Sequence, residues 1–199
     1  MHALIDLAGS RNDPGRRTGS TDLRLRLKEA TADAHRQLDR SLMAFDLKTS
    51  AGYRRFLEAS AGALLPLEAA LVESGVDEIV EDWPSRSRTD AMLDDLAQID
   101  GKLRLMPAPV AFSRSALLGT MYVLEGSRLG ARFLLKLVAR STDPAMTRAT
   151  AYLSHGSGGP LWEQFLLLLA REAPRVDEDE VVAGAHGAFG LFSMAAARA

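Results

Sequence analysis

The sequence lacks cysteine altogether, which excludes disulfide bonds, thiolate metal ligands and a cysteine nucleophile. It also lacks a strong charge of one sign, because its formal net charge is −2 over 199 residues, so neither nucleic acid nor an anionic membrane is the expected partner. No apolar run approaches the roughly 18 residues of a membrane-spanning helix, and the N-terminus has no signal-peptide pattern. These absences indicate a soluble protein of the cytoplasm.

Several sequence patterns are missing as well. No stretch alternates apolar and polar residues as a strand does, and no internal repeat or nucleotide-binding glycine motif occurs. What is present is a composition of 47% hydrophobic and 25% charged residues. A chain of this size and composition forms one globular domain that buries roughly 70% of its unfolded surface. We therefore expect an all-α protein, a single-domain helical bundle.

The chain divides into a short polar start and a long periodic remainder. Residues 1–20 are rich in Gly, Arg, Asp and Ser without periodicity, which predicts a mobile tail ahead of a helical domain over 21–199. The first helix is expected to begin at a cap, either Ser20 or Thr21. Apolar residues at helical spacing predict helices over about 20–40, 50–74 with a bend near Pro66, 89–99, 113–140, 144–153, 160–173 and 179–197.

The long helix predicted over 113–140 carries three interior glycines. Gly119, Gly126 and Gly130 fall within about 40° of one another on a helical wheel. Each interior glycine makes a helix less stable than alanine does, by roughly 0.8 to 1 kcal/mol. The presence of three glycines on one side of the helix therefore needs an explanation. One reason is the close packing of a second helix, for which small residues are used. The other is a flat group that lies against the bare backbone.

The segment LKEATADAH, residues 27–35, supplies a candidate ligand for such a group. Lys28, Thr31 and His35 lie on the flank of the apolar stripe of the first predicted helix. Zinc or non-haem iron needs several histidine or carboxylate ligands, whereas haem iron needs one proximal histidine, so the isolated His35 favours haem. Lys28 lies two turns away, roughly 10 Å by helical rise, which suits a haem propionate. Asp39, one turn after His35, is placed to accept a hydrogen bond from the imidazole N–H of His35 that does not bind the iron.

Each of these residues also has an ordinary structural interpretation. A histidine at the edge of an apolar stripe is more often part of the fold than a ligand, and Lys28 is then a solvated surface charge. His186, on the last predicted helix near Phe189, is the rival iron ligand, although no cation lies at a comparable spacing from it. His2 belongs to the predicted tail. His155 lies in the loop SHGSGG, which lacks the Lys-Ser/Thr of a phosphate-binding loop.

Over residues 22–197 the sequence resembles the haem oxygenases, and within them the bacterial type found with bacteriophytochromes. LKEATADAH matches the proximal-helix pattern of that family, with His35 at the iron-ligand position and Lys28 at a propionate-contacting position. YVLEGSRLGARF is similar to the bacterial distal helix, with Gly126 and Gly130 at its glycine positions. Weaker similarity lies in LWEQFLLLL and in AHGAFGLF, where Phe189 falls at an aromatic position near the haem.

The resemblance implies an activity and a set of site residues. The activity is the O2-dependent opening of haem to biliverdin with release of iron and carbon monoxide. Electrons would come from a separate ferredoxin or reductase, and a bacteriophytochrome is a possible recipient of the biliverdin. The implied site consists of the metal ligand His35, the catalytic distal residues Gly126, Ser127 and Gly130, and the haem-binding residues Lys28, Thr31 and Phe189.

Two residues depart from the family pattern, and two other functions stay open. Ala131 stands where many members have a second glycine, and its methyl group is expected to restrict distal access slightly. Ser127 stands roughly where mammalian relatives place an acidic residue that orders distal water. The alternatives are a non-catalytic haem carrier or sensor of the same fold, and a helical module without a cofactor. Four arginines are candidates for propionate contacts: Arg114, Arg128, Arg132 and Arg171.

Overall fold

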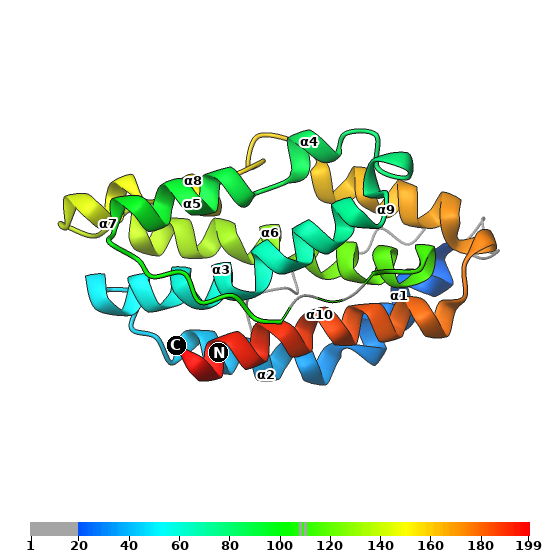
Figure 1. The fold of residues 1–199 in the computed structure, drawn as a ribbon, viewed down its shortest axis with the longest axis horizontal. Coiled ribbons are helices and arrows are strands. Elements are labelled where there is room, and N and C mark those ends of the chain that lie inside the picture. Colours follow the sequence, from blue (N-terminus) through cyan, green and yellow to red (C-terminus); the bar gives the residue numbers. More distant parts are fainter. Residues whose placement is uncertain (1–19, 108, 110) are drawn as a thin grey trace.

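The computed structural model describes residues 20–107, 109 and 111–199, and every regular element in this part of the chain is a helix (Figure 1). The predicted all-α class is confirmed. The predicted tail lies outside the described residues except for Ser20, as do the side chains of the two candidate caps, Ser20 and Thr21. The elements are α1 (Ser20–Ala30), α2 (Ala32–Met43), α3 (Ser50–Glu73), η1 (Val76–Glu78), α4 (Trp83–Arg86), α5 (Thr89–Gln98), α6 (Arg114–Val138), α7 (Pro144–Arg148), α8 (Ala151–Ser154), α9 (Leu161–Glu172), η2 (Ala173–Arg175) and α10 (Glu178–Arg198).

The first predicted helix is interrupted at Thr31, which separates α1 from α2. Thr31 adopts a φ of −95° and a ψ of 0°. Its amide N–H and its hydroxyl both donate to the Leu27 carbonyl, at 3.0 and 2.7 Å. A hydroxyl that bonds back to the preceding turn competes with the regular helix ladder, so the break has a local cause. The apolar stripe continues across the break, because Leu27 and Leu38 are both buried.

The long helix α3 contains Pro66 in its interior, and its two halves run in different directions in Figure 1. Proline cannot donate a hydrogen bond to the preceding turn, which weakens the helix at that point. The Thr49 hydroxyl caps the start of α3 by accepting from the Gly52 N–H at 3.1 Å. Beyond α3, the connection to α5 holds the short turns η1 and α4, and the helix predicted over 144–153 is split into α7 and α8.

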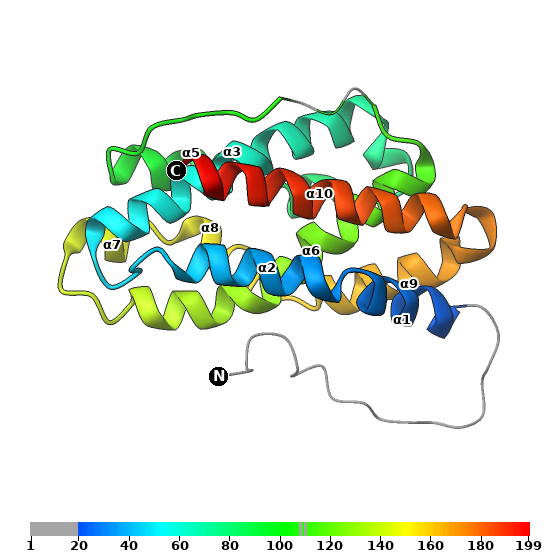
Figure 2. The ribbon, with the colours of Figure 1, turned by 90° about the horizontal axis from the view of Figure 1, so that it is seen from below.

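The last helix, α10, is central to the bundle, with α6, α3 and α2 packed around it (Figure 2). It crosses α6 at two glycines. A Cβ built on Gly119 would lie 1.9 Å from the Val181 carbonyl oxygen, and one built on Gly184 would lie 2.3 Å from the Ala116 carbonyl oxygen. Only glycine permits two backbones to approach so closely. By length and composition α10 could also span a membrane, but buried core helices of soluble proteins share that property.

Two buried carboxylates join helices that are distant in sequence. Glu68 of α3 accepts a hydrogen bond from the Arg88 N–H at 2.9 Å, just before the start of α5. Asp95 of α5 accepts from the N–H groups of Ala151 and Tyr152 at 2.9 and 2.8 Å, at the start of α8. Burial raises the pKa of Asp95, and these two donors oppose the rise. The two carboxylates thereby fix α5 to α3 on one side and to α8 on the other.

Candidate functional site

His35, the predicted iron ligand, lies on α2 with 26% of its side chain exposed. Its ring meets that of Phe189 from α10 edge to face, with the ring centroids 5.7 Å apart and an interplanar angle of 63°. Phe189 itself is buried. The fold therefore brings together two predicted site residues that are far apart in the sequence. The imidazole is steadied by an aromatic ring and is still accessible to a ligand.

Asp39 is the polar neighbour of His35 on the same helix. Its Oδ1 lies 3.6 Å from the His35 Nε2, one helical turn away, and both side chains are partly exposed. Burial raises the pKa of Asp39, and the positive charge of a protonated His35 opposes that rise. The two groups are neighbours, as the spacing predicts, at a distance longer than a hydrogen bond.

Lys28 and Thr31 precede His35 and are separated from it by the helix break. Lys28 is exposed in the last turn of α1. Thr31 is buried, and its hydroxyl proton is taken up by the Leu27 carbonyl. The Thr31 side chain therefore has no free O–H donor to offer a neighbouring group. The roles of both residues toward haem remain predictions.

The spacing of the three glycines of α6 predicts one bare strip along the helix. The structure does not show such a strip. Gly119 lies against the backbone of α10. The interpretation that a flat group lies against this glycine is therefore wrong, and Gly119 serves helix packing. A Cβ built on Gly126 would make ordinary van der Waals contact with the Trp162 ring at 3.6 Å, whereas one built on Gly130 meets nothing within 4 Å. Room beside the bare backbone is therefore found at Gly130.

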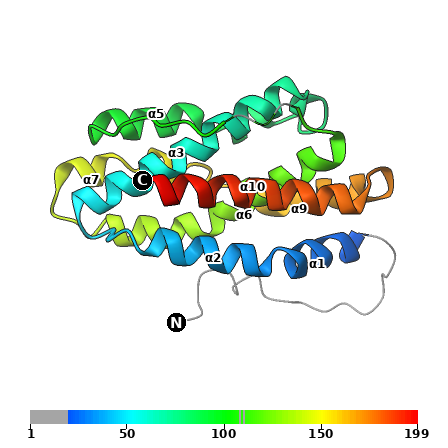
Figure 3. The same cartoon turned by 60° about the horizontal axis from the view of Figure 1, so that its bottom comes forward.

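Around Gly130 the second half of α6 presents a partly exposed apolar surface. On one flank of Gly126 and Gly130 the neighbours on the helical wheel are apolar or aromatic and not buried, whereas on the other flank Val123 is buried and Ser127 is polar. Phe133 is the most open, with 46% exposure. Figures 2 and 3 show α2 and this half of α6 running in the same direction. We call this surface the open side of α6; it consists of Tyr122, Gly126, Leu129, Gly130, Phe133 and Leu137.

The open side of α6 and His35 together suit a flat apolar group with one axial nitrogen ligand. Haem iron needs one proximal histidine, and its macrocycle needs an apolar surface on which to lie. His35 provides the imidazole from α2, Phe189 an aromatic neighbour, and Gly130 room beside the helix backbone. Among the described residues, no three His, Asp or Glu side chains gather to hold a metal ion. The residues present therefore fit haem.

Ala131 does not narrow the open side of α6. Its side chain is 8% exposed and belongs to the hydrophobic core. It lies about 100° around the helix from Gly130, because each residue of an α-helix turns by that angle. The methyl group packs inward, so the predicted restriction of distal access is wrong.

The remaining histidines have other surroundings. His186, the rival ligand, is exposed on α10. His2 lies outside the described residues. His155 follows α8 and is partly buried, with its Nδ1 3.1 Å from Nη1 of Arg128. Burial and the charge of Arg128 both lower the pKa of His155.

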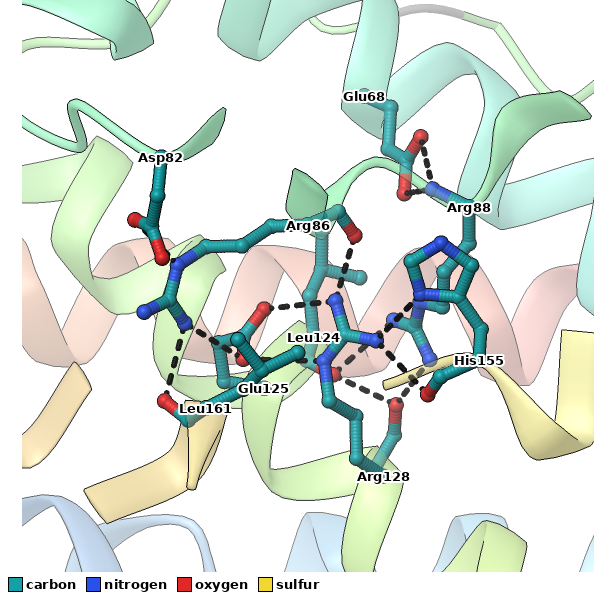
Figure 4. A network of polar contacts seen from close by, with 10 residues as sticks. Glu68, Asp82, Arg86, Arg88, Leu124, Glu125, Arg128, His155 and Leu161 are labelled. Atoms are coloured by element: carbon teal, nitrogen blue, oxygen red, sulfur yellow. Dashed lines mark hydrogen bonds and ion pairs between the residues drawn. The ribbon is translucent and has the colours of Figure 1, made fainter. Parts of the chain in front are cut away.

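Behind α6, away from its open side, lies a buried polar network that the sequence did not indicate (Figure 4). Arg128 donates to Glu125 from Nε and Nη2, both at 3.0 Å, and Arg86 of α4 donates to the same carboxylate at 2.9 Å. Arg86 also donates to the Leu161 carbonyl at 3.0 Å and to Asp82 at 2.7 Å. Two guanidinium groups thus anchor the middle of α6 to α4 and to the start of α9.

A third guanidinium of the network, that of Arg88, is 1% exposed and has a different set of partners. Nη1 donates to the Ser127 hydroxyl oxygen and Nη2 to the Leu124 carbonyl, both at 3.0 Å. The guanidinium carbon lies 5.3 Å from the centre of the Tyr152 ring, a cation–π distance. Nε has no hydrogen-bond partner among the described residues. Figure 4 shows this group beside those of Arg86 and Arg128.

The arginine candidates for propionate contacts differ in their surroundings. Arg128 is buried in the network described above. Arg114 and Arg171 both donate to the buried carboxylate of Glu172 at the end of α9, at 2.6 and 3.2 Å. Arg132 is exposed. Three of the four are therefore already engaged by carboxylates of the protein.

The fold and the site together define a class: an all-α protein in which a partly exposed histidine packs on an aromatic ring and a long helix carries glycine on a partly exposed apolar side. A family model described as "Heme oxygenase" matches residues 21–197. The match covers nearly the whole chain, so the protein belongs to the haem oxygenase family.

Two similar proteins are bacterial. A curated "Heme oxygenase" of Xanthomonas campestris pv. campestris (strain 8004) is 28% identical over 145 residues, which are 70% of this chain and 86% of that protein. The fold is similar to the crystal structures of the NO- and CO-bound heme oxygenase from Neisseria meningitidis, with a TM-score of 0.74 and 21% identity. That alignment covers 88% of this chain and 90% of the other. Haem as the substrate is therefore a family property.

Proposed function

We propose that this protein opens haem to biliverdin and releases iron and carbon monoxide, using O2 and externally supplied electrons. The observation that carries the proposal is the pairing of a partly exposed His35, set against Phe189, with the room beside Gly130 on α6. Membership of the family supports the general activity. The particular product and the residue roles are the proposal.

Each proposed residue has a defined task at the site. His35 would ligate the iron, and the ring of Phe189 would limit the directions in which the imidazole can turn. Lys28, exposed at the end of α1, would pair with a propionate. Gly126 and Gly130 would let the α6 backbone lie close to the macrocycle. Bound haem supplies both the redox centre that activates O2 and the bond that is broken.

The partners follow from what the chain does not carry. No nucleotide or flavin motif occurs in the sequence, so electrons would come from a separate ferredoxin or reductase. A bacteriophytochrome is the proposed recipient of biliverdin. The absence of cysteine and of strong positive charge supports a cytoplasmic location without nucleic acid or membrane partners.

A hemin titration of the wild type, of His35→Ala and of His186→Ala tests the ligand. His186 is the matched control, because it is a histidine exposed on another helix. We expect a sharp Soret band and stoichiometric binding for wild type and His186→Ala, and a broadened band with weaker binding for His35→Ala. An unchanged spectrum in His35→Ala would place the ligand elsewhere.

Reduction of the hemin complex in air with a ferredoxin system tests the reaction. We expect the Soret band to decay while biliverdin and carbon monoxide appear in equal amounts. A stable oxygen complex without biliverdin would instead identify a haem carrier or sensor. Failure to bind hemin at all would identify a helical module without a cofactor.

A further inference from the structure

Arg88 is a buried cation without a carboxylate partner among the described residues. Its guanidinium donates to a hydroxyl and a carbonyl, lies over the Tyr152 ring and leaves Nε without an acceptor. The neighbouring Arg86 and Arg128 both bind Glu125 instead. A buried charge that is not neutralised is destabilising, so its retention at this position calls for a functional explanation.

The Ser127 hydroxyl connects this cation to the distal helix. Its oxygen accepts from Arg88 at 3.0 Å, and its proton is directed to the Leu124 carbonyl at 2.7 Å. That carbonyl also accepts from Nη2 of Arg88 at 3.0 Å. Because Arg88 already donates to the Leu124 carbonyl, the Ser127 proton can turn elsewhere without leaving this carbonyl unpaired. A hydroxyl whose oxygen accepts from a cation is also a stronger donor.

Ser127 lies between Arg88 and the open side of α6. Ser127 is partly exposed and lies about 60° from Gly130 on the helical wheel, at the edge of the open side of α6. Arg88 lies on the inner side, in the network of Figure 4. The hydroxyl therefore stands between a buried positive charge and the surface on which haem is proposed to lie.

We propose that Arg88 and Ser127 form a cationic donor pair, in which Arg88 polarises the Ser127 hydroxyl so that it donates to a ligand bound to the distal face of haem. The inference rests on the proposed function. Arg88 is a positioning residue, because it acts through Ser127. A positive charge thus lies behind Ser127 in this protein, at roughly the position where mammalian relatives carry an acidic residue.

The charges around Arg88 are mixed in sign. Arg86 and Arg128 lie in the same network and Glu125 neutralises part of their charge. Glu68 accepts from the Arg88 backbone N–H, not from its guanidinium. His155 lies beside Arg128, and burial lowers its pKa, as do the charges of Arg128 and Arg88. The charge directly behind Ser127 is therefore that of Arg88.

The carbon monoxide complex of the ferrous haem protein tests the pair, because the C–O stretching frequency falls when a donor or a positive charge approaches the oxygen. The variants are Ser127→Ala, Arg88→Met, Arg88→Lys and the double variant Ser127→Ala/Arg88→Met. Arg148→Met, on the exposed end of α7, is the control for loss of one positive charge. Hemin affinity and circular dichroism are measured for each.

We expect the C–O band to move to higher wavenumber in Ser127→Ala and Arg88→Met, to move less in Arg88→Lys, and to stay in place in Arg148→Met. Most of the shift caused by Arg88→Met should vanish in the Ser127→Ala background, because the two residues act as one unit. Hemin affinity should change less than twofold. Ser127→Ala keeps the test valid if Arg88→Met does not fold, since alanine suits a helix.

Two outcomes would overturn the inference alone. One is normal hemin binding with an unmoved band in Ser127→Ala. The other is an Arg88→Met shift of the same size with and without Ser127, which would mean that the charge acts directly. Absence of hemin binding by the wild type would overturn the proposed function as well.

Discussion

The two halves of α6 use glycine for opposite purposes. In the first half, Gly119 admits the backbone of α10, and a Cβ there would collide with the Val181 carbonyl. In the second half, a Cβ on Gly130 would meet nothing within 4 Å. Two glycines at nearly the same angle on the helical wheel thus have different surroundings. Another helix packs on Gly119, whereas the space beside Gly130 is free. The phase of a glycine therefore says which side is bare, and only the neighbouring helices say what approaches it.

The largest predicted effect concerns the anchor behind the open half. Glu125→Ala should lower the free energy of unfolding by about 3 to 5 kcal/mol, because it removes the buried carboxylate that Arg86 and Arg128 share. Asp82→Ala is the matched control, since the Asp82 carboxylate binds the same Arg86 but is 45% exposed. It should change stability by less than about 1 kcal/mol. Urea unfolding measures both, and equal losses would contradict the prediction.

The next effect concerns the closed half. Gly119→Ala should lower the free energy of unfolding by about 3 kcal/mol, because the new methyl group meets helix backbone and not a flexible side chain. Thermal unfolding followed by circular dichroism measures the loss. A variant as stable as the wild type would mean that α6 and α10 are further apart than the structure places them.

The same substitution in the open half should act in the reverse direction on stability. Gly130→Ala should raise the free energy of unfolding by about 0.8 kcal/mol, because alanine favours the helix and has room. It should also weaken hemin binding by roughly tenfold, about 1.4 kcal/mol, if haem lies against this backbone. Gly187→Ala on α10 is the control, since its Cβ is equally free. It should gain stability without a change in hemin affinity.

The smallest predicted effect is a pH dependence of the free energy of unfolding, caused by His155. Burial, together with the charges of Arg128 and Arg88, lowers the pKa of His155 in the folded protein. The unfolded chain therefore binds the proton more readily, and the free energy of unfolding should fall as the pH drops below about 6.5 and stay level above it. Unfolding curves from pH 5 to 8 measure the slope. His155→Gln should remove that part of it, and an identical slope in the variant would exclude His155 as its source.

Helix existence could be predicted from the sequence, because apolar periodicity extends over most of each helix. α6 spans Arg114–Val138 where 113–140 is predicted, and α10 spans Glu178–Arg198 where 179–197 is predicted. The break at Thr31 was missed, because it depends on one hydroxyl that bonds the Leu27 carbonyl while the apolar stripe continues. The split between α7 and α8 was missed for a similar reason, since both are short and apolar residues continue across them.

The candidate site could be predicted only in its local parts. His35 and Phe189 were singled out separately, and the fold brings their rings together. The role of Gly119 depends on where α10 runs, which no local pattern indicates. Arg86 and Arg88 lie in the connection between α3 and α5, and their burial follows from the placement of this connection against α6. Charge partners from four separate segments meet there, and no spacing along the chain encodes such a meeting.

Both walls of the proposed haem site are fastened to one element. α10 holds α6 through the glycine crossing at Gly119 and Gly184, and it meets α2 where Phe189 packs on His35. The position of the imidazole relative to Gly130 therefore depends on how α10 packs against α2 and α6, and α10 also contributes Phe189 to the site. Substitutions on α10 at its contacts with α2 and α6 would therefore change the space that is available to a macrocycle.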